Sequence, residues 1–258
     1  MAASGGFIEH AVRAWIFLLP HESFRASTLN VVLSISGKLA GDRLSPIMRI
    51  LSQLLKELPL MFLECIVSQF PPKKLGTDIS GLYCTLTSMD IIAAISKTSL
   101  NIFTSPLAVR WVFDITKSMS KVHAPTDNSL HCLQQGHSFL RHSLLIMQQD
   151  RIAEVLRWGF LKLIPPSAAA LNSDLCEMAK MRCNEAWVEM FQIFTSYLTW
   201  LPVMRLVHRH IPLVEHLVYS SVQPVTREAW CTLVQVGNQY GSLYHALRQR
   251  RVCTTVGV

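Results

Sequence analysis

The chain has 258 residues, of which 50% are hydrophobic and 16% are charged, and its mean hydropathy is +0.29. Globular domains carry about 25% charged residues, so this chain is unusually apolar. That composition excludes intrinsic disorder, which requires low hydrophobicity and high net charge. Its 11 glycines and 12 prolines follow no period, which excludes collagen-like and low-complexity classes. A chain of this length buries about three-quarters of its surface and needs no disulfide or metal to hold a core.

Positive charge is concentrated toward the C-terminal end. The 24 Lys and Arg exceed the 17 Asp and Glu by seven, and residues 205–258 supply four of these seven charges. The basic residues of that stretch are Arg205, Arg209, Arg227, Arg248, Arg250 and Arg251. A basic end attracts phosphates or acidic partners. The simpler interpretation is that the last three arginines complement the negative end of a helix dipole.

Cysteine usage and the N-terminal residues indicate the compartment. The seven cysteines are scattered and odd in number, which is typical of reduced thiols. Glu9, His10 and Arg13 interrupt the apolar stretch that a secretory signal would need. No run of about 18 strongly apolar residues predicts a transmembrane helix. We therefore expect an intracellular protein, cytoplasmic or nuclear.

Apolar residues recur at helical spacing along the whole chain, and Pro, Gly and Asp mark short links. The predicted helices are 7–19, 28–39, 46–58, 80–97, 106–119, 129–149, 151–164, 174–200, 203–220 and 227–251. Ser105-Pro106 predicts a helix start, Thr226 predicts an N-cap, and Pro165-Pro166 predicts a helix stop. No segment alternates with a period of two for long, so the predicted fold class is all-α.

About ten helices with short links fit an irregular bundle or a short α-solenoid of HEAT or armadillo type. We expect one helical domain over residues 1–258, with a soft boundary near the proline-rich link 71–78. The two Ser-Pro helix starts have flanks that do not align, so no repeat is assigned.

Histidine and cysteine are frequent, but their spacing does not predict a metal site. The two clusters are His131, Cys132, His137 and His142, and His208, His210 and His216. Zinc sites usually present ligand pairs as CxxC or HxxxH, and neither pattern occurs. No nucleophile elbow or reactive-cysteine signature occurs either. We expect no cofactor, no metal and no catalytic residues.

The six tryptophans fall one to a helix, which is typical of core anchors. A base-stacking platform would interleave them with arginine on one surface. Only residues 204–216 mix basic and apolar residues closely enough to be considered for nucleic-acid contact.

The last predicted helix, TREAWCTLVQVGNQYGSLYHALRQRRVC, is similar to the helix that leads into the zinc finger of fungal (basidiomycete) MYND-type proteins. Trp230, Arg248, Arg250, Arg251 and Cys253 fill the places of that family's tryptophan, basic tail and first zinc-ligand cysteine. The resemblance implies a long helical region before a finger. The sequence departs from the family after Cys253, where TTVGV replaces the remaining zinc ligands. We therefore expect the helical part without its finger, and no zinc role for any residue.

These observations favour a non-enzymatic interaction or scaffold module with an unknown protein partner. The residues expected to bind it are Arg205, Arg209, Arg248, Arg250 and Arg251. The alternative is a nucleic-acid-associated protein that uses the same basic end, which steep salt dependence would reveal. A third alternative is an enzyme with a pocket of converging titratable groups inside the helical core.

Overall fold

The structure is a computed structural model that describes residues 10, 14, 17, 67, 70–72, 79–95, 105–122, 125–146, 149–172 and 177–255. The side chains at 84, 88, 90–95 and 247–255 lie outside this description. The described residues form helices joined by short links and contain no strand, which confirms the all-α prediction. The helices predicted over 7–19, 28–39 and 46–58 fall almost entirely outside the described residues.

The chain divides into two compact units, Met1–Ile146 and Met147–Val258. The first unit contains α5 (Ile79–Ile95), α7 (Pro106–Met119) and α8 (Asp127–Ile146), and α8 packs against both other helices. The Trp111 indole N–H donates to the Phe70 carbonyl at 2.9 Å and so fixes the link before α5. Only residues 71 and 72 of the predicted boundary at 71–78 are described, so that boundary stays a prediction.

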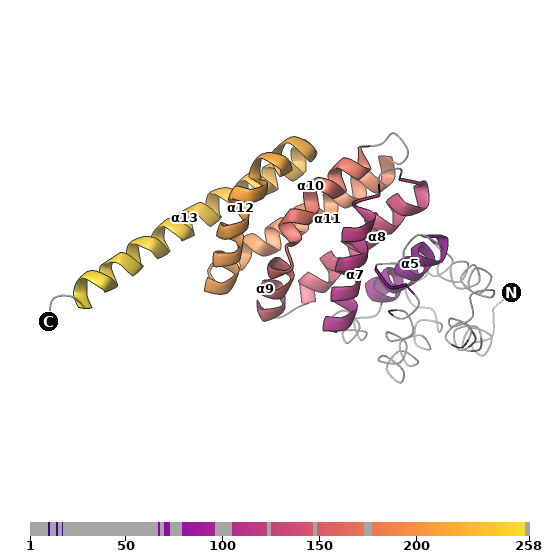
Figure 1. The fold of residues 1–258 in the computed structure, drawn as a ribbon, viewed down its shortest axis with the longest axis horizontal. Helices are drawn as coiled ribbons and strands as arrows, with labels where there is room; N and C mark the ends of the chain where they lie inside the picture. The colour runs from indigo at the N-terminus through magenta and orange to yellow at the C-terminus, as the bar shows by residue number, and fades with distance from the viewer. Residues whose placement is uncertain are drawn as a thin grey trace. The chain divides into compact units, whose positions relative to one another are not determined.

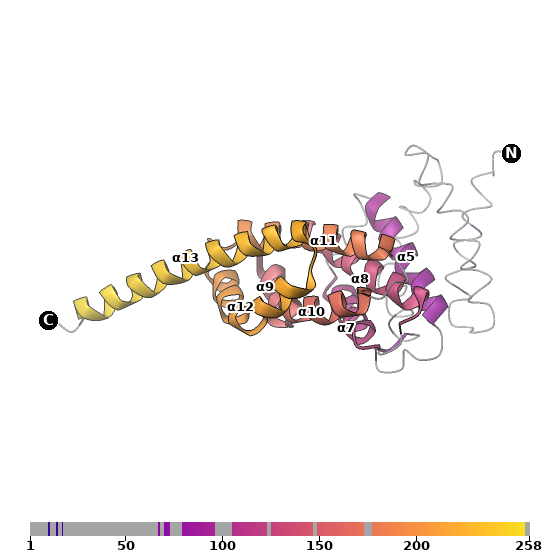
Figure 2. The same cartoon turned by 90° about the horizontal axis from the view of Figure 1, so that it is seen from above.

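The second unit contains five helices, shown in Figures 1 and 2. They are α9 (Gln149–Arg157), α10 (Phe160–Leu171), α11 (Glu177–Ser196), α12 (Leu201–Ser221) and α13 (Pro224–Thr255). α12 packs against α9, α10 and α13, and α11 packs against α13. Since two residues link α12 to α13, the two helices run antiparallel. The buried face of α12 carries Val and Ile at the three- and four-residue spacing of a helix, and α13 buries Trp230, Leu233 and Val234.

The predicted helix 151–164 is wrong in both its continuity and its end. Gly159 has a φ of +94°, which glycine adopts without a Cβ clash, and it separates α9 from α10. α10 then continues through Pro165 and Pro166 to Leu171. Each proline removes one helical N–H donor, but buried residues on both sides of the pair keep the segment packed on the core. Tertiary burial here outweighs the cost of two prolines.

Thr226 is also not the N-cap of the last helix, because α13 begins two residues earlier at Pro224. Its buried hydroxyl instead donates to Asn184 Oδ1 at 2.7 Å. The same Oδ1 accepts the backbone N–H of Gln223 at 3.2 Å, and Asn184 Nδ2 donates to the Lys180 carbonyl at 2.8 Å. One buried asparagine on α11 thus fixes the turn from α12 into α13.

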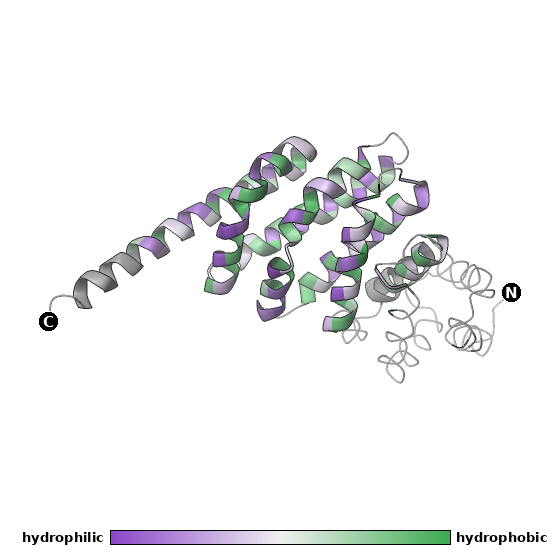
Figure 3. Cartoon of the chain, in the orientation of Figure 1, coloured by the Kyte–Doolittle hydropathy of each residue, from purple (hydrophilic) through white to green (hydrophobic). Residues whose placement is uncertain are grey.

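Of the five described tryptophans, Trp111, Trp187 and Trp230 are at most 3% exposed and act as core anchors, as predicted. Trp158 and Trp200 instead lie between helices and are partly exposed. In Figure 3 hydrophobic and hydrophilic residues are interspersed along α7 and α12. None of the described helices is long and apolar enough to cross a membrane.

Candidate functional site

Two of the five arginines singled out in the sequence, Arg205 and Arg209, lie at the contact between α12 and α13. Arg205 and Arg209 are exposed and lie one turn apart on α12. Arg248, Arg250 and Arg251 belong to the last turns of α13, where the backbone is helical and the side chains are outside the described residues. The structure therefore places two of the five predicted residues, both on α12, at one site beside α13.

Two glycines let α13 approach α12 closely. A Cβ at Gly237 would lie 3.2 Å from Ile211 Cδ1, and one at Gly241 would lie 2.4 Å from His208 Cδ2. The second distance is far shorter than the 3.5–4.0 Å of an ordinary carbon–carbon contact. The spacing of four residues places both glycines on one face of α13. The absence of a side chain at Gly237 makes room for Ile211 and Val207, and its absence at Gly241 makes room for the His208 ring.

Next to Gly241 the two helices enclose a pocket of about 260 Å³, which we call the basic pocket. Its lining residues are Met204, Arg205, His208, Arg209, Gly241, Tyr244 and His245. The Arg205 guanidinium donates to the Tyr244 hydroxyl and lies over its ring, with Cζ 5.0 Å from the centroid. The rings of His208 and His245 are 5.9 Å apart between centroids.

Positive charge in the basic pocket is uncompensated within the described part of the chain. No carboxylate lines the pocket, and neither Arg205 nor Arg209 forms a salt bridge with a described residue. The pKa of the adjacent His210 also responds to positive charge. Burial lowers its pKa, and the positive charges of Lys162 and Arg209 lower it further. The arrangement suits an anion.

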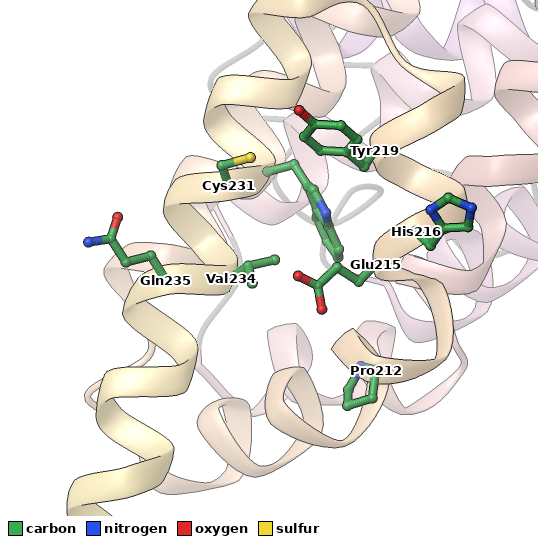
Figure 4. A pocket seen from close by; sticks show the side chains of 8 residues that line it. Pro212, Glu215, His216, Tyr219, Cys231, Val234 and Gln235 are labelled. Carbon is green, nitrogen blue, oxygen red and sulfur yellow. The ribbon is translucent and has the colours of Figure 1, made fainter.

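Further along the same two helices lies a wider opening of about 630 Å³, the Trp230 pocket (Figure 4). Its lining residues are Pro212, Glu215, His216, Tyr219, Trp230, Cys231, Val234 and Gln235. In Figure 4 the Cys231 thiol points toward the Tyr219 ring, the Glu215 carboxylate points into the opening and the Gln235 amide points away. The Arg227 guanidinium carbon lies 4.6 Å from the Tyr219 ring centroid.

The Trp230 pocket brings together side chains of several chemistries, among them a carboxylate, an imidazole, a phenol and a thiol. Cys231 is exposed, and the indole Nε1 of the buried Trp230 has no hydrogen-bond partner. Among the described residues, Cys231 forms no side-chain hydrogen bond. In the described residues, no three His, Cys, Asp or Glu side chains gather closely enough to hold a metal ion.

The two histidine clusters seen in the sequence separate in space. His137 is fully buried in α8, and burial lowers its pKa to about 3. Cys132, on the same helix, donates weakly from Sγ to the Ile79 carbonyl at 3.7 Å. On α12, His208 lines the basic pocket, whereas His210 is buried. His137 and His210 therefore lie in the core, whereas His208 lies in the pocket wall.

Sequence reasoning missed the contribution of α13 to the basic pocket. The sequence patterns single out neither Tyr244 nor His245, although both residues line the pocket. The available signal was the pair Gly237 and Gly241, because glycines four residues apart allow close helix contact. No protein-family model, curated protein or solved structure matches the chain.

Proposed function

We propose that the chain is a non-enzymatic, all-α protein-interaction module that binds an acidic segment of a protein partner in the basic pocket. The observation that carries the proposal is the convergence of Arg205 and Arg209 on a pocket that no described carboxylate lines. Uncompensated positive charge steers acidic partners during association and selects against basic ones. The Arg205–Tyr244 contact orders one of the two guanidinium groups before a partner arrives, which lowers the entropy cost of binding.

The C-terminal part of α13 enlarges the proposed binding surface. His245 lines the basic pocket, and α13 continues for ten more residues to Thr255, about 15 Å at the rise of an α-helix. Arg248, Arg250 and Arg251 lie in these ten residues. Arg248 follows Tyr244 by one turn, so its backbone position continues the face of α13 that borders the pocket.

The wider architecture is part of the same proposal. We infer about ten helices in an irregular bundle or short α-solenoid, since helical periodicity continues through the residues before α5. The likeness of residues 226–253 to fungal MYND-type proteins supports identifying the chain as the helical portion that precedes such a finger. The partner would then be intracellular, in the cytoplasm or the nucleus.

Selection from a random peptide library displayed on phage tests the proposal. The full chain is immobilised, and we expect the recovered peptides to be enriched in Asp and Glu. In the Arg205→Glu/Arg209→Glu variant the dissociation constants of these peptides should rise about tenfold or more, because the pocket then repels them. Arg182→Glu is the matched control, because Arg182 is exposed on α11 and lines neither pocket.

Unchanged helical circular dichroism in each variant shows that the fold is retained. Recovered peptides without acidic enrichment, or equal loss of binding in the Arg182→Glu control, would contradict the proposal.

A second candidate function is nucleic-acid binding through the same arginines, because phosphodiesters are anionic as well. Its signature is a steep salt dependence: log K should fall with log salt at a slope of about −0.9 for each phosphate contacted on a duplex. Fluorescence anisotropy with a labelled duplex, read at several salt concentrations, separates the candidates. Peptide binding without duplex binding supports the protein partner, and the reverse supports the nucleic acid.

A further inference from the structure

The donors of the basic pocket determine which anion it fits best. Arg205 carries five N–H donors in a planar fork, and one of them is used on the Tyr244 hydroxyl. The hydrogen bond to the Tyr244 hydroxyl and the cation–π contact with its ring, with Cζ 5.0 Å from the centroid, restrict the orientation of the remaining donors. Arg209, one turn further on α12, supplies a second fork on the same side of the helix. Two guanidinium forks can bracket a single tetrahedral group.

The pocket also has room for more than a carboxylate. Its volume of about 260 Å³ equals the liquid volume of about nine water molecules. His208 and His245 border this space, and an imidazole provides at least one ring N–H in either protonation state. A group with three acceptor oxygens can therefore meet donors from both helices at once.

The charges around the pocket also favour a phosphoryl monoester over a carboxylate. Two guanidinium charges face the pocket, and no described carboxylate lines it. Along α12 the next acidic residue is Glu215, six positions beyond Arg209 and about 9 Å along the helix axis. A carboxylate neutralises one charge with two oxygens. A phosphoryl monoester carries about −1.5 to −2 at pH 7 and offers three oxygens, so it matches both guanidinium groups.

We propose that the basic pocket recognises a phosphorylated side chain, a phosphoryl monoester dianion, within the acidic segment of the protein partner. This inference rests on the proposed function and narrows its ligand. A phosphodiester in a nucleic acid carries a single charge for each phosphate, and the phosphate sits between two sugars. It therefore satisfies the two forks less well than the terminal phosphoryl group of a phosphoserine.

A synthetic peptide library tests the inference without knowledge of the partner. Three pools share degenerate flanking residues and differ only at a fixed central residue: serine, glutamate or phosphoserine. Each pool is passed over the immobilised full chain, and retained peptide is quantified by mass spectrometry. We expect about tenfold more retention of the phosphoserine pool than of the glutamate pool, since two charge-assisted hydrogen bonds are added. Inorganic phosphate should compete with retention.

Substitutions of the two arginines test whether the retained peptide binds in the basic pocket. Arg205→Gln and Arg209→Gln should each reduce the phosphoserine pool to the level of the glutamate pool. Arg209→Lys keeps the charge but loses the fork, so it should retain an intermediate amount. Arg182→Gln, the exposed control on α11, should behave as the unmodified chain.

The outcomes distinguish this inference from the proposed function. Equal retention of the glutamate and phosphoserine pools, both above serine, would overturn the phosphoryl inference and leave the acidic-segment proposal standing. Equal retention of all three pools would overturn both. Retention of the phosphoserine pool that survives both glutamine variants would place the binding elsewhere and overturn the inference. Loss of retention to a competing oligonucleotide at stoichiometric concentration would overturn it in favour of nucleic-acid binding.

Discussion

His137 lies on α8 with no exposed surface, and burial lowers the pKa of its imidazole from 6.5 to about 3. The charged form is disfavoured because the surrounding core cannot solvate it. In the unfolded chain the same imidazole takes up a proton near its ordinary pKa of about 6.5. Between these two values the unfolded chain binds one more proton than the folded chain. Stability is therefore complete above pH 6.5 and falls as the pH drops toward 3.

The size of this effect follows from the two pKa values. The free energy of unfolding should fall by about 1.4 kcal/mol for each pH unit below 6.5 from His137 alone. Between pH 7.5 and pH 5.0 the loss amounts to about 2 kcal/mol. That is a substantial fraction of the roughly 5–15 kcal/mol by which domains are stable.

The assay compares the unmodified chain with His137→Gln by urea unfolding at pH 7.5, 6.5, 5.75 and 5.0. The variant should lose the His137 component of the pH dependence, whatever its stability at pH 7.5. His210 is present in both chains, so its own lowered pKa cancels in the comparison. A second readout is the imidazole NMR signal of His137, which should not shift between pH 7.5 and 5.0. Parallel pH dependences of the two chains, or a titrating His137 signal, would refute the reasoning.

Three further substitutions probe the helix contacts. Gly136→Ala would place a methyl group 2.2 Å from Thr116 Oγ1 in the core, so thermal unfolding should show a loss of about 1–3 kcal/mol despite the better helix propensity of alanine. Asn184→Ala leaves a buried hydroxyl and a backbone N–H without their acceptor, and urea titration should show a loss of about 2–4 kcal/mol. Gly241→Ala should displace the His208 ring into solvent and cut phosphoserine-pool retention, while stability changes by about 1 kcal/mol or less. Undiminished stability in the first two, or undiminished retention in the third, would contradict the packing described above.

Most of the helical layout could be predicted from the sequence, because local signals and burial agree along most of the chain. The predicted spans 80–97, 129–149 and 203–220 differ by at most three residues at either end from α5, α8 and α12. The failure came at Pro165-Pro166, where a local stop signal competes with burial on both sides of the pair. The energetic cost of a proline arises within its own helical turn, but the core contacts that offset this cost come from distant residues.

The candidate site could be predicted only in part. Arg205 and Arg209 share a helix, so their spacing alone places them on the same side. Tyr244, the partner of Arg205, comes from a second helix 39 residues further along the chain. Which residues of α13 meet α12 depends on how closely and at what register the helices cross. Periodicity gives the buried face of each helix but not the pairing between two faces.

Gly241 links the packing of α12 and α13 to the proposed partner binding more directly than Arg205 and Arg209 do. Any side chain at this position would compete with the His208 ring for space, and glycine costs about 1 kcal/mol in a helix interior relative to alanine. A Cβ at Gly237, one turn earlier, would lie 3.2 Å from Ile211 Cδ1, which is a milder clash than the one at Gly241. The second glycine makes room for the wall of the basic pocket. An interaction site built in this way should be more sensitive to Gly241→Ala than to Gly237→Ala, although both substitutions favour the helix.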